Sequence, residues 1–229
     1  EHIEDIIITD GYVGGQAVVE YFRGLLLTLK GTSSEAMSVS VKWDGAPAVV
    51  CGTNPDNGQF FVGTKAVFAK AAKINYTKKD IAKNHGTEEL GQKLLKCLVH
   101  LKKLNIQGVV QGDLLYTDEG ITRKNIDGKP HLTFTPNTIT YAVPEGSELS
   151  KQIDRAKVGI IFHTTYTGES LASMDAQGGA DISSFSKSND VFFDNASYKD
   201  VSGSAKFTDD ETKQFYNSIE KLETLLNGV

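Results

Sequence analysis

Apolar and polar residues recur along the chain with two periods, which predict helices near both ends and strands between them. Residues 18–29 place apolar side chains at helical spacing, and Gly31 follows as a stop. Near the C-terminus, the segment from Thr208 has the same spacing and opens with the capping-box pattern Thr-Asp-Asp-Glu. We therefore predict an amphipathic N-terminal helix and a C-terminal helix over residues 208–227.

Between these helices the pattern changes to strict alternation or to short apolar runs, which are typical of strands. Residues 38–43 alternate between a polar and an apolar side chain. Turn residues at 54–58 separate two apolar runs, which predicts a hairpin. The predicted strands that follow residue 43 are 47–51, 59–63, 107–116, 132–134, 139–143 and 158–162.

The remaining helices are predicted from candidate N-cap residues and from stripes of apolar residues at helical spacing. Thr77 and Thr87 are candidate caps of two helices, and leucines between 90 and 101 form one apolar stripe in the second. A short helix is predicted over 147–156. Since helices and strands mix without regular alternation, we predict an α+β fold with largely antiparallel sheets flanked by helices.

The length of 229 residues allows one large domain or two small ones, and we interpret residues 1–229 as a single domain. Residues 168–190 are rich in Gly, Ser, Ala and Asp, so a loop-rich insertion is expected over 168–207. No apolar run approaches the roughly 20 residues of a membrane span. The N-terminal residues are acidic where a signal peptide would be basic, which favours a cytoplasmic protein without a membrane partner. Cys51 and Cys97 lie in apolar settings and are expected to be buried free thiols.

The net charge of −5 is unevenly distributed. Residues 61–103 contain ten lysines and three acidic residues, a net charge of +7, which leaves −12 for the rest of the chain. Such asymmetry indicates either a binding surface for a polyanion or a solvated helix face. The candidate nucleic-acid contacts are Lys70, Lys73, Lys78, Lys79 and Lys83.

The candidate for chemistry is the string Lys42-Trp43-Asp44-Gly45. A lysine amine attacks only when it is neutral, and burial or a neighbouring cation favours that form. Such an amine could take the α-phosphoryl group of a nucleotide as a phosphoramidate. Asp44 could orient the amine or a metal ion, and Gly45 would let the backbone pass close to the nucleotide. The alternative is a surface lysine near a turn, because so short a string also occurs by chance.

With this string the sequence resembles the covalent nucleotidyltransferase superfamily of ATP-dependent DNA ligases, RNA ligases and mRNA capping enzymes, and most closely its bacteriophage-type members. The resemblance covers roughly residues 38–166 and implies a ligase adenylation-domain fold. It identifies Lys42 as the lysine that becomes adenylylated or guanylylated, with Val41 and Gly45 beside the nucleotide. There is no phosphate-binding Gly-x-x-x-x-Gly-Lys-Ser/Thr loop, which excludes the P-loop route to nucleotide binding.

Three further strings are similar to motifs of that superfamily. Lys65 ends the string Phe-Val-Gly-Thr-Lys after the predicted hairpin, and the resemblance makes it a ribose or phosphate contact. Asp113, in Val-Val-Gln-Gly-Asp-Leu, becomes the carboxylate that binds ribose or metal, because an acid in so apolar a strand needs a partner. Phe162 is the candidate for stacking on the purine, with core packing as the alternative.

The resemblance implies an ATP-dependent polynucleotide ligase that uses ATP and Mg²⁺ and joins DNA or RNA ends through a lysyl-AMP intermediate, as a monomer, in the host cytoplasm if it is phage-encoded. The late Glu-Gly and Lys-x-Lys motifs and a C-terminal barrel are missing, which favours a fragment over a divergent relative. The alternatives are a capping-type guanylyltransferase and a non-catalytic nucleic-acid-binding phage protein on a ligase-like fold.

Overall fold

The computed structural model describes residues 3–32, 41–197 and 206–228, which fall into two compact units. One unit contains the described residues at the two ends of the chain, and the other contains residues 41–197. The structure therefore differs from the single domain predicted from the sequence. The two terminal helices pack on each other and form the core of their own unit.

The terminal unit is a pair of helices, α1 (Ile3–Leu29) and α5 (Asp209–Asn227). Val19, Leu26 and Ile219 are buried between them. Both predicted helices are confirmed, and the capping box is present because the Thr208 side chain and the Glu211 side chain bond each other's backbone N–H groups. Helix α1 begins earlier than predicted and is kinked at Gly11, whose φ of 59° suits glycine.

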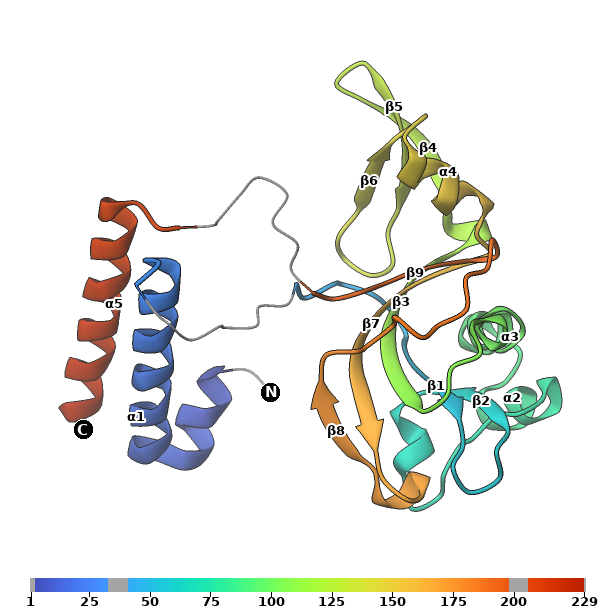
Figure 1. Ribbon diagram of the computed structural model, residues 1–229, viewed down its shortest axis with the longest axis horizontal. Coiled ribbons are helices and arrows are strands. Elements are labelled where there is room, and N and C mark those ends of the chain that lie inside the picture. The colour runs from blue at the N-terminus through green and yellow to red at the C-terminus, as the bar shows by residue number, and fades with distance from the viewer. Residues whose placement is uncertain (1–2, 33–40, 198–205, 229) are drawn as a thin grey trace. The chain divides into compact units, whose positions relative to one another are not determined.

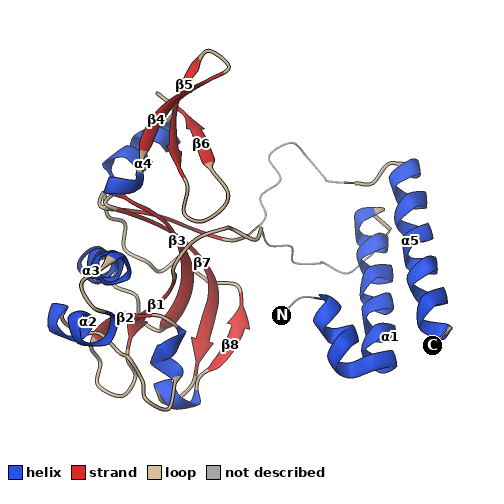
Figure 2. Cartoon of the chain, turned by 180° about the vertical axis from the view of Figure 1, so that it is seen from behind, coloured by secondary structure: helices blue, strands red, loops and turns tan. Residues whose placement is uncertain are grey.

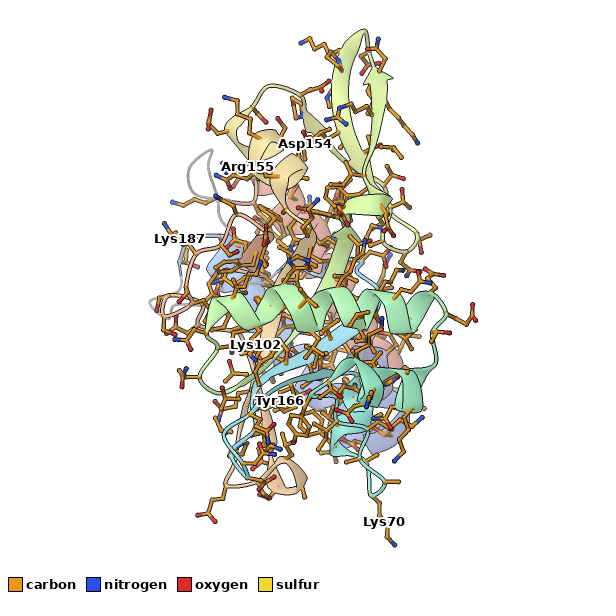
Figure 3. The ribbon with its side chains drawn as sticks, turned by 90° about the vertical axis from the view of Figure 1, so that its right-hand side faces the viewer. Lys70, Lys102, Asp154, Arg155, Tyr166 and Lys187 are labelled. Atoms are coloured by element: carbon orange, nitrogen blue, oxygen red, sulfur yellow. The ribbon has the colours of Figure 1, made fainter. Side chains whose placement is uncertain are left out.

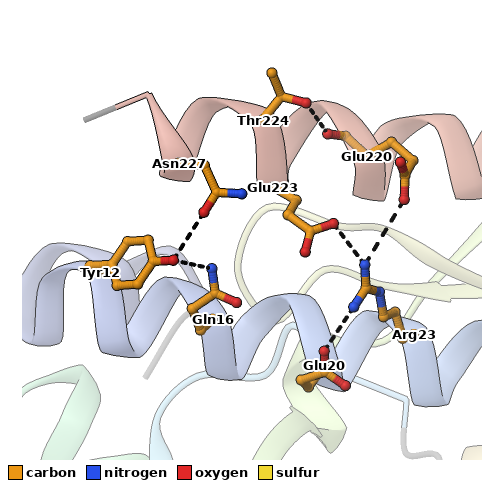
Figure 4. A network of polar contacts seen from close by, with 8 residues as sticks. All are labelled: Tyr12, Gln16, Glu20, Arg23, Glu220, Glu223, Thr224 and Asn227. Atoms are coloured by element: carbon orange, nitrogen blue, oxygen red, sulfur yellow. Dashed lines mark hydrogen bonds and ion pairs between the residues drawn. The ribbon is translucent and has the colours of Figure 1, made fainter.

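Polar side chains flank this apolar seam (Figure 4). Arg23 bonds Glu20 at 2.9 Å on its own helix and Glu223 at 2.7 Å on α5. At the other end of the pair, the Tyr12 hydroxyl donates to Asn227 at 2.9 Å. These contacts fix the pairing of two helices whose shared core is small.

The second unit is built on a six-stranded sheet, as Figure 1 shows. The strand order is β2-β1-β3-β7-β8, with β9 also paired to β7. All pairs are antiparallel except β7 with β9. The strands are β1 (Ala48–Thr53), β2 (Phe60–Gly63), β3 (Val109–Thr117), β7 (Val158–Thr167), β8 (Asp175–Gly178) and β9 (Val191–Asn195). The predicted hairpin and the two long central strands are confirmed, whereas β8 and β9 fall within the segment predicted as a loop-rich insertion.

Helices α2 (Lys78–His85) and α3 (Glu89–Leu101) lie on one side of this sheet (Figure 2). Leu94, Leu98 and Leu101 of the predicted stripe pack on strand residues that include Val110 and Val158. Thr77 caps α2 as predicted. The predicted cap at Thr87 is wrong, because α3 begins one residue later with Glu88 as a cap that makes no side-chain bond.

A second, three-stranded sheet is inserted between β3 and β7, followed by a short helix. Its strands are β4 (Thr122–Ile126), β5 (Lys129–Phe134) and β6 (Tyr141–Pro144), and the helix is α4 (Glu148–Arg155). Leu132 and Phe134 pack with Leu115 and Ile161 of the main sheet. The coarse prediction of a largely antiparallel α+β fold is therefore confirmed.

The alternating segment 38–43 gives the clearest local difference. Residues 38–40 lie outside the described part, and residues 41–43 form no strand. The apolar position Trp43 instead packs on Tyr141 of β6, with ring centroids 5.1 Å apart. Both cysteines are buried free thiols, as predicted. Within the described residues, no helix is both long and apolar enough to span a bilayer.

Candidate functional site

Residues 41–47, called the Lys42 segment below, connect two parts of the main sheet through backbone bonds. The Val41 N–H donates to the Ala196 carbonyl, just after β9, at 2.8 Å. The Ala46 N–H donates to the Leu114 carbonyl of β3 at 3.0 Å. The segment is thus anchored at both ends before the chain enters β1.

Gly45 lies directly against Asp113. A Cβ atom added at Gly45 would stand 2.4 Å from the Asp113 Cβ atom and 2.9 Å from the Leu114 carbonyl oxygen. Real side chains do not approach so closely, so only glycine fits this backbone path. The structure therefore brings together the string Lys42-Trp43-Asp44-Gly45 and Asp113 of the apolar strand β3, which are separate motifs in the sequence.

Asp113 has a partner that sequence reasoning missed. His163 Nε2 on β7 lies 3.4 Å from Asp113 Oδ1, and the Asp113 side chain is only 20% exposed. A register shift opposite Gln111 and Gly112 gives β7 one extra residue at this point, which places His163 beside Asp113. The only available signal was the expectation that an acid in an apolar strand needs a partner on a neighbouring strand.

The polar groups of this part of the sheet continue from Asp113 to Gln111. The side-chain oxygen of Gln111 accepts a 2.7 Å hydrogen bond from the buried Tyr166 hydroxyl of β7. Gln111 is itself buried, and the bond satisfies its oxygen without a charge. Gln111 and Asp113 are therefore two polar residues, two positions apart on β3, within largely apolar surroundings.

The Asp44 side chain, which was expected to orient the amine or a metal ion, instead accepts hydrogen bonds from residues 137–139. Its Oδ2 accepts from the backbone N–H groups of Thr138 at 2.7 Å and Ile139 at 2.9 Å, and its Oδ1 accepts from Asn137 at 3.0 Å. These bonds, first of all that from Ile139, hold the pKa of the Asp44 carboxyl below its ordinary value of 3.8. Asp44 thus fixes the loop that precedes β6.

Lys42 itself is exposed, and in the part of the chain that the structure describes it has no hydrogen bond or ion pair. Its neighbours on both sides are held, since Val41 is bonded to Ala196 and Trp43 packs on Tyr141. The amine is therefore free at a position where the backbone is fixed.

Two other candidates lie in contrasting surroundings. Lys65 begins the 3₁₀ helix η1 (Lys65–Phe68) directly after the hairpin and is exposed. Phe162 is fully buried in the core under α3, where it contacts Phe185 and Phe193 edge to face. Of the two roles considered for Phe162, this placement is that of a core residue, because a ring without exposed area offers no face to a purine.

The lysines of the basic stretch divide into paired and unpaired groups. Lys93, Lys96 and Lys103 bond acidic side chains, and the Lys73 amine donates to the Asn84 carbonyl at 3.2 Å. Lys70 extends away from the body of this unit in Figure 3. We use the name lysine surface for the exposed lysines of residues 70–83 that form no hydrogen bond or ion pair with described residues, which are Lys70, Lys78, Lys79 and Lys83.

One carboxylate beside the Lys42 segment is available to a magnesium ion or a nucleotide. Mg²⁺ in nucleotide sites is held by one or two carboxylates together with substrate phosphates. Asp113 fits that role, whereas the Asp44 carboxylate is used by the loop at 137–139. Among the described residues, no group of three or more His, Cys, Asp or Glu side chains could hold a metal by itself.

Comparison with protein families matches residues 1–229 to DUF6267, a family of unknown function. No curated protein and no solved structure matches the chain.

Proposed function

This chain belongs to the DUF6267 family, and we propose that it is an ATP-dependent polynucleotide ligase that works through a lysyl-AMP intermediate. The observation that carries the proposal is the packing of Gly45 on Asp113. It joins a free lysine on a fixed backbone to a partly buried carboxylate, as a lysine nucleophile with a ribose or metal ligand requires.

The proposed first step is a transfer of the adenylyl group. The lone pair of the neutral Lys42 amine forms a bond to the α-phosphorus of ATP, the bond between that phosphorus and the bridging oxygen breaks, and pyrophosphate leaves with the electron pair. The amine proton passes to solvent. A 5′-phosphate end then takes the adenylyl group from the lysine, and a 3′-hydroxyl displaces AMP to form the phosphodiester.

The roles of the surrounding groups follow from their contacts. Asp113 would bind the ribose hydroxyls or Mg²⁺, which supplies charge compensation for the phosphates, and His163 would hold the Asp113 carboxylate in place from 3.4 Å. Asp44 would position the loop at 137–139 rather than meet the nucleotide. The lysine surface would contact the nucleic-acid backbone without reading its sequence.

The direct test is intact mass after incubation with ATP and Mg²⁺. The wild-type chain should gain one adenylyl group, and Lys42→Ala should gain none. Lys70→Ala is the matched control, because it also removes an exposed lysine without partners and should keep the adduct. Absence of an adduct on the wild type, or its persistence in Lys42→Ala, would rule out this covalent mechanism for the chain.

A binding measurement separates loss of chemistry from loss of the site. Trp43 is the only tryptophan and lies next to Lys42, so its fluorescence reports on this segment alone. ATP should change that fluorescence in Lys42→Ala as well as in the wild type, since the variant keeps Asp113 and the backbone path. Replacing ATP with GTP tests the capping-type guanylyltransferase, for which only GTP would give an adduct.

A second candidate is a non-catalytic nucleic-acid-binding protein. It is favoured by the lysine surface together with the use of the Asp44 carboxylate by a loop. Salt-dependent binding of nucleic acid without an adduct from either nucleotide would support it over the ligase.

A further inference from the structure

A separate pocket of about 630 Å³ lies where α4, the segment 182–189 and strand β9 meet. None of the Lys42 segment, Asp113 or His163 contributes to it. Its volume is within the range of roughly 300–1,000 Å³ that is usual for small-molecule sites. We call it the Arg155 pocket, and its lining includes Arg155, Phe185, Lys187, Phe192 and Phe193.

Two cationic residues and no acidic residue line the Arg155 pocket. Arg155, on the last turn of α4, and Lys187, on the segment that leads to β9, both line it and lie on the same side of the molecule in Figure 3. Neither forms an ion pair within the described residues. The acids next in sequence are committed elsewhere, since Asp154 bonds Arg123 at 2.7 Å and Asp190 bonds Lys103.

The apolar lining is aromatic. Phe185 and Phe193 contact each other with ring centroids 6.0 Å apart, and both are anchored on the buried Phe162. Phe192 is only partly buried and lies parallel to Tyr116, with ring centroids 6.5 Å apart. Phe185 and Phe193 are therefore held against the core while they line the pocket, whereas Phe192 alternates to the other face of β9 and reaches the pocket from there.

We propose that the Arg155 pocket binds a nucleotide unit, with the base against the phenylalanine rings and the phosphate between Arg155 and Lys187. An arginine gives a forked set of donors that matches phosphate oxygens, and aromatic rings stack on any base. A simple anion would leave the rings unused, and an apolar ligand would leave two cations without partners. The site does not depend on Lys42, so it stands even if the proposed ligase function fails.

The test measures binding by isothermal titration calorimetry with two probes, thymidine 5′-monophosphate and a 5′-phosphorylated thymidine hexanucleotide. Arg155→Gln/Lys187→Gln should weaken binding by about tenfold or more, because two charge-assisted contacts to phosphate are lost. Both positions are exposed, so the variant should keep its fold, which thermal unfolding checks. The matched control is Lys129→Gln/Lys151→Gln, two exposed lysines that do not line the pocket.

The two probes identify the source of the nucleotide unit. Equal loss for both probes supports a site for a free nucleotide, and loss for the hexanucleotide alone supports a site for a single strand. Lys70→Gln/Lys79→Gln guards against binding at the lysine surface, and it should leave monophosphate binding unchanged. The proposal is overturned if neither probe binds the wild type, or if the Arg155/Lys187 variant binds both probes as tightly as the control variant.

Discussion

The Lys42 segment and the lysine surface both present exposed lysines, but the fold holds them in opposite ways. Around Lys42, the backbone is bonded to Ala196 and Leu114, and Gly45 fits against Asp113 without room for a side chain. The lysine surface is carried by the loop after η1 and by α2, and no described carboxylate forms an ion pair with its amines.

This difference separates two kinds of function. A reacting amine must be held near its target within a fraction of an ångström, so the backbone beneath it has to be fixed. Contacts to a phosphate backbone need only charge, because counterion release supplies the free energy. In the proposed function, the Lys42 segment would therefore supply the chemistry and the lysine surface the affinity for nucleic acid.

The largest effect is expected from a substitution that disrupts the contact between Gly45 and Asp113. Gly45→Ala should abolish the adenylyl adduct, because the added methyl group must displace Asp113 or the Lys42 segment. Overpacking of this kind costs about 1–3 kcal/mol of unfolding free energy. Intact mass measures the first effect and urea unfolding the second. Gly178→Ala is the control, since a Cβ there meets nothing within 4 Å. If Gly45→Ala formed the adduct as well as Gly178→Ala, the contact would have no bearing on the chemistry.

The fold around this contact was largely predictable from local patterns. The hairpin of β1 and β2, the buried strands β3 and β7 and the capped α5 each carry their own signal. Strands β4 and β8 carried none, because every residue in both is exposed and neither alternates in hydrophobicity. Strand β9 depends on parallel pairing with β7, a long-range contact that a local pattern cannot contain.

The next effect concerns the lysine surface. Lys78→Gln/Lys79→Gln should weaken single-stranded DNA binding by about tenfold near 0.1 M salt and lower the salt slope by about 1.4, since each phosphate contact to a single strand contributes about 0.7. Lys93→Gln/Lys103→Gln removes the same charge from lysines already neutralised by Glu89 and Asp190, and should change both quantities much less. Fluorescence anisotropy over a salt series measures both. Equal losses from the two variants would mean that net charge, and not this surface, sets the affinity.

Lys65 lies in sequence between the Lys42 segment and the lysine surface, so a variant of Lys65 tests to which of the two it belongs. It follows the hairpin that leads from the Lys42 segment, yet it is as exposed as the lysines of the lysine surface. We expect Lys65→Ala to slow adduct formation by about tenfold through loss of one phosphate contact, while DNA binding changes little. Single-turnover mass measurements give the rate, with Lys70→Ala as control. The reverse result, weaker binding of DNA with an unchanged rate of adduct formation, would assign Lys65 to the lysine surface.

The candidate site was predictable only in part. Lys42, Gly45 and Asp113 stood out because each is unusual for its local surroundings. His163 did not, because a register shift between β3 and β7 decides which residue faces Asp113. The use of Asp44 by the loop at 137–139 was equally hidden, since the donors are backbone N–H groups that every sequence has.

The smallest effect tests how firmly Asp44 holds that loop. The pKa of the Asp44 carboxyl lies below 3.8 in the folded chain, so its bonds stabilise the fold above the unfolded pKa and are lost as the pH falls through the folded value. Asp44→Asn should therefore lower the Tm by a few degrees at pH 7, and the difference from wild type should shrink as the pH falls below about 3.8.

Thermal unfolding at a series of pH values measures this difference. The control is Asp175→Asn, an exposed acid whose side chain forms no hydrogen bond within the described residues. A gap between Asp44→Asn and wild type that stays constant to low pH would show that the charge of Asp44 is not what holds the loop. The packing of Trp43 on Tyr141 would then be the contact that fixes the backbone beside Lys42. The contrast between a held lysine and a free lysine surface would in that case depend on shape rather than on electrostatics.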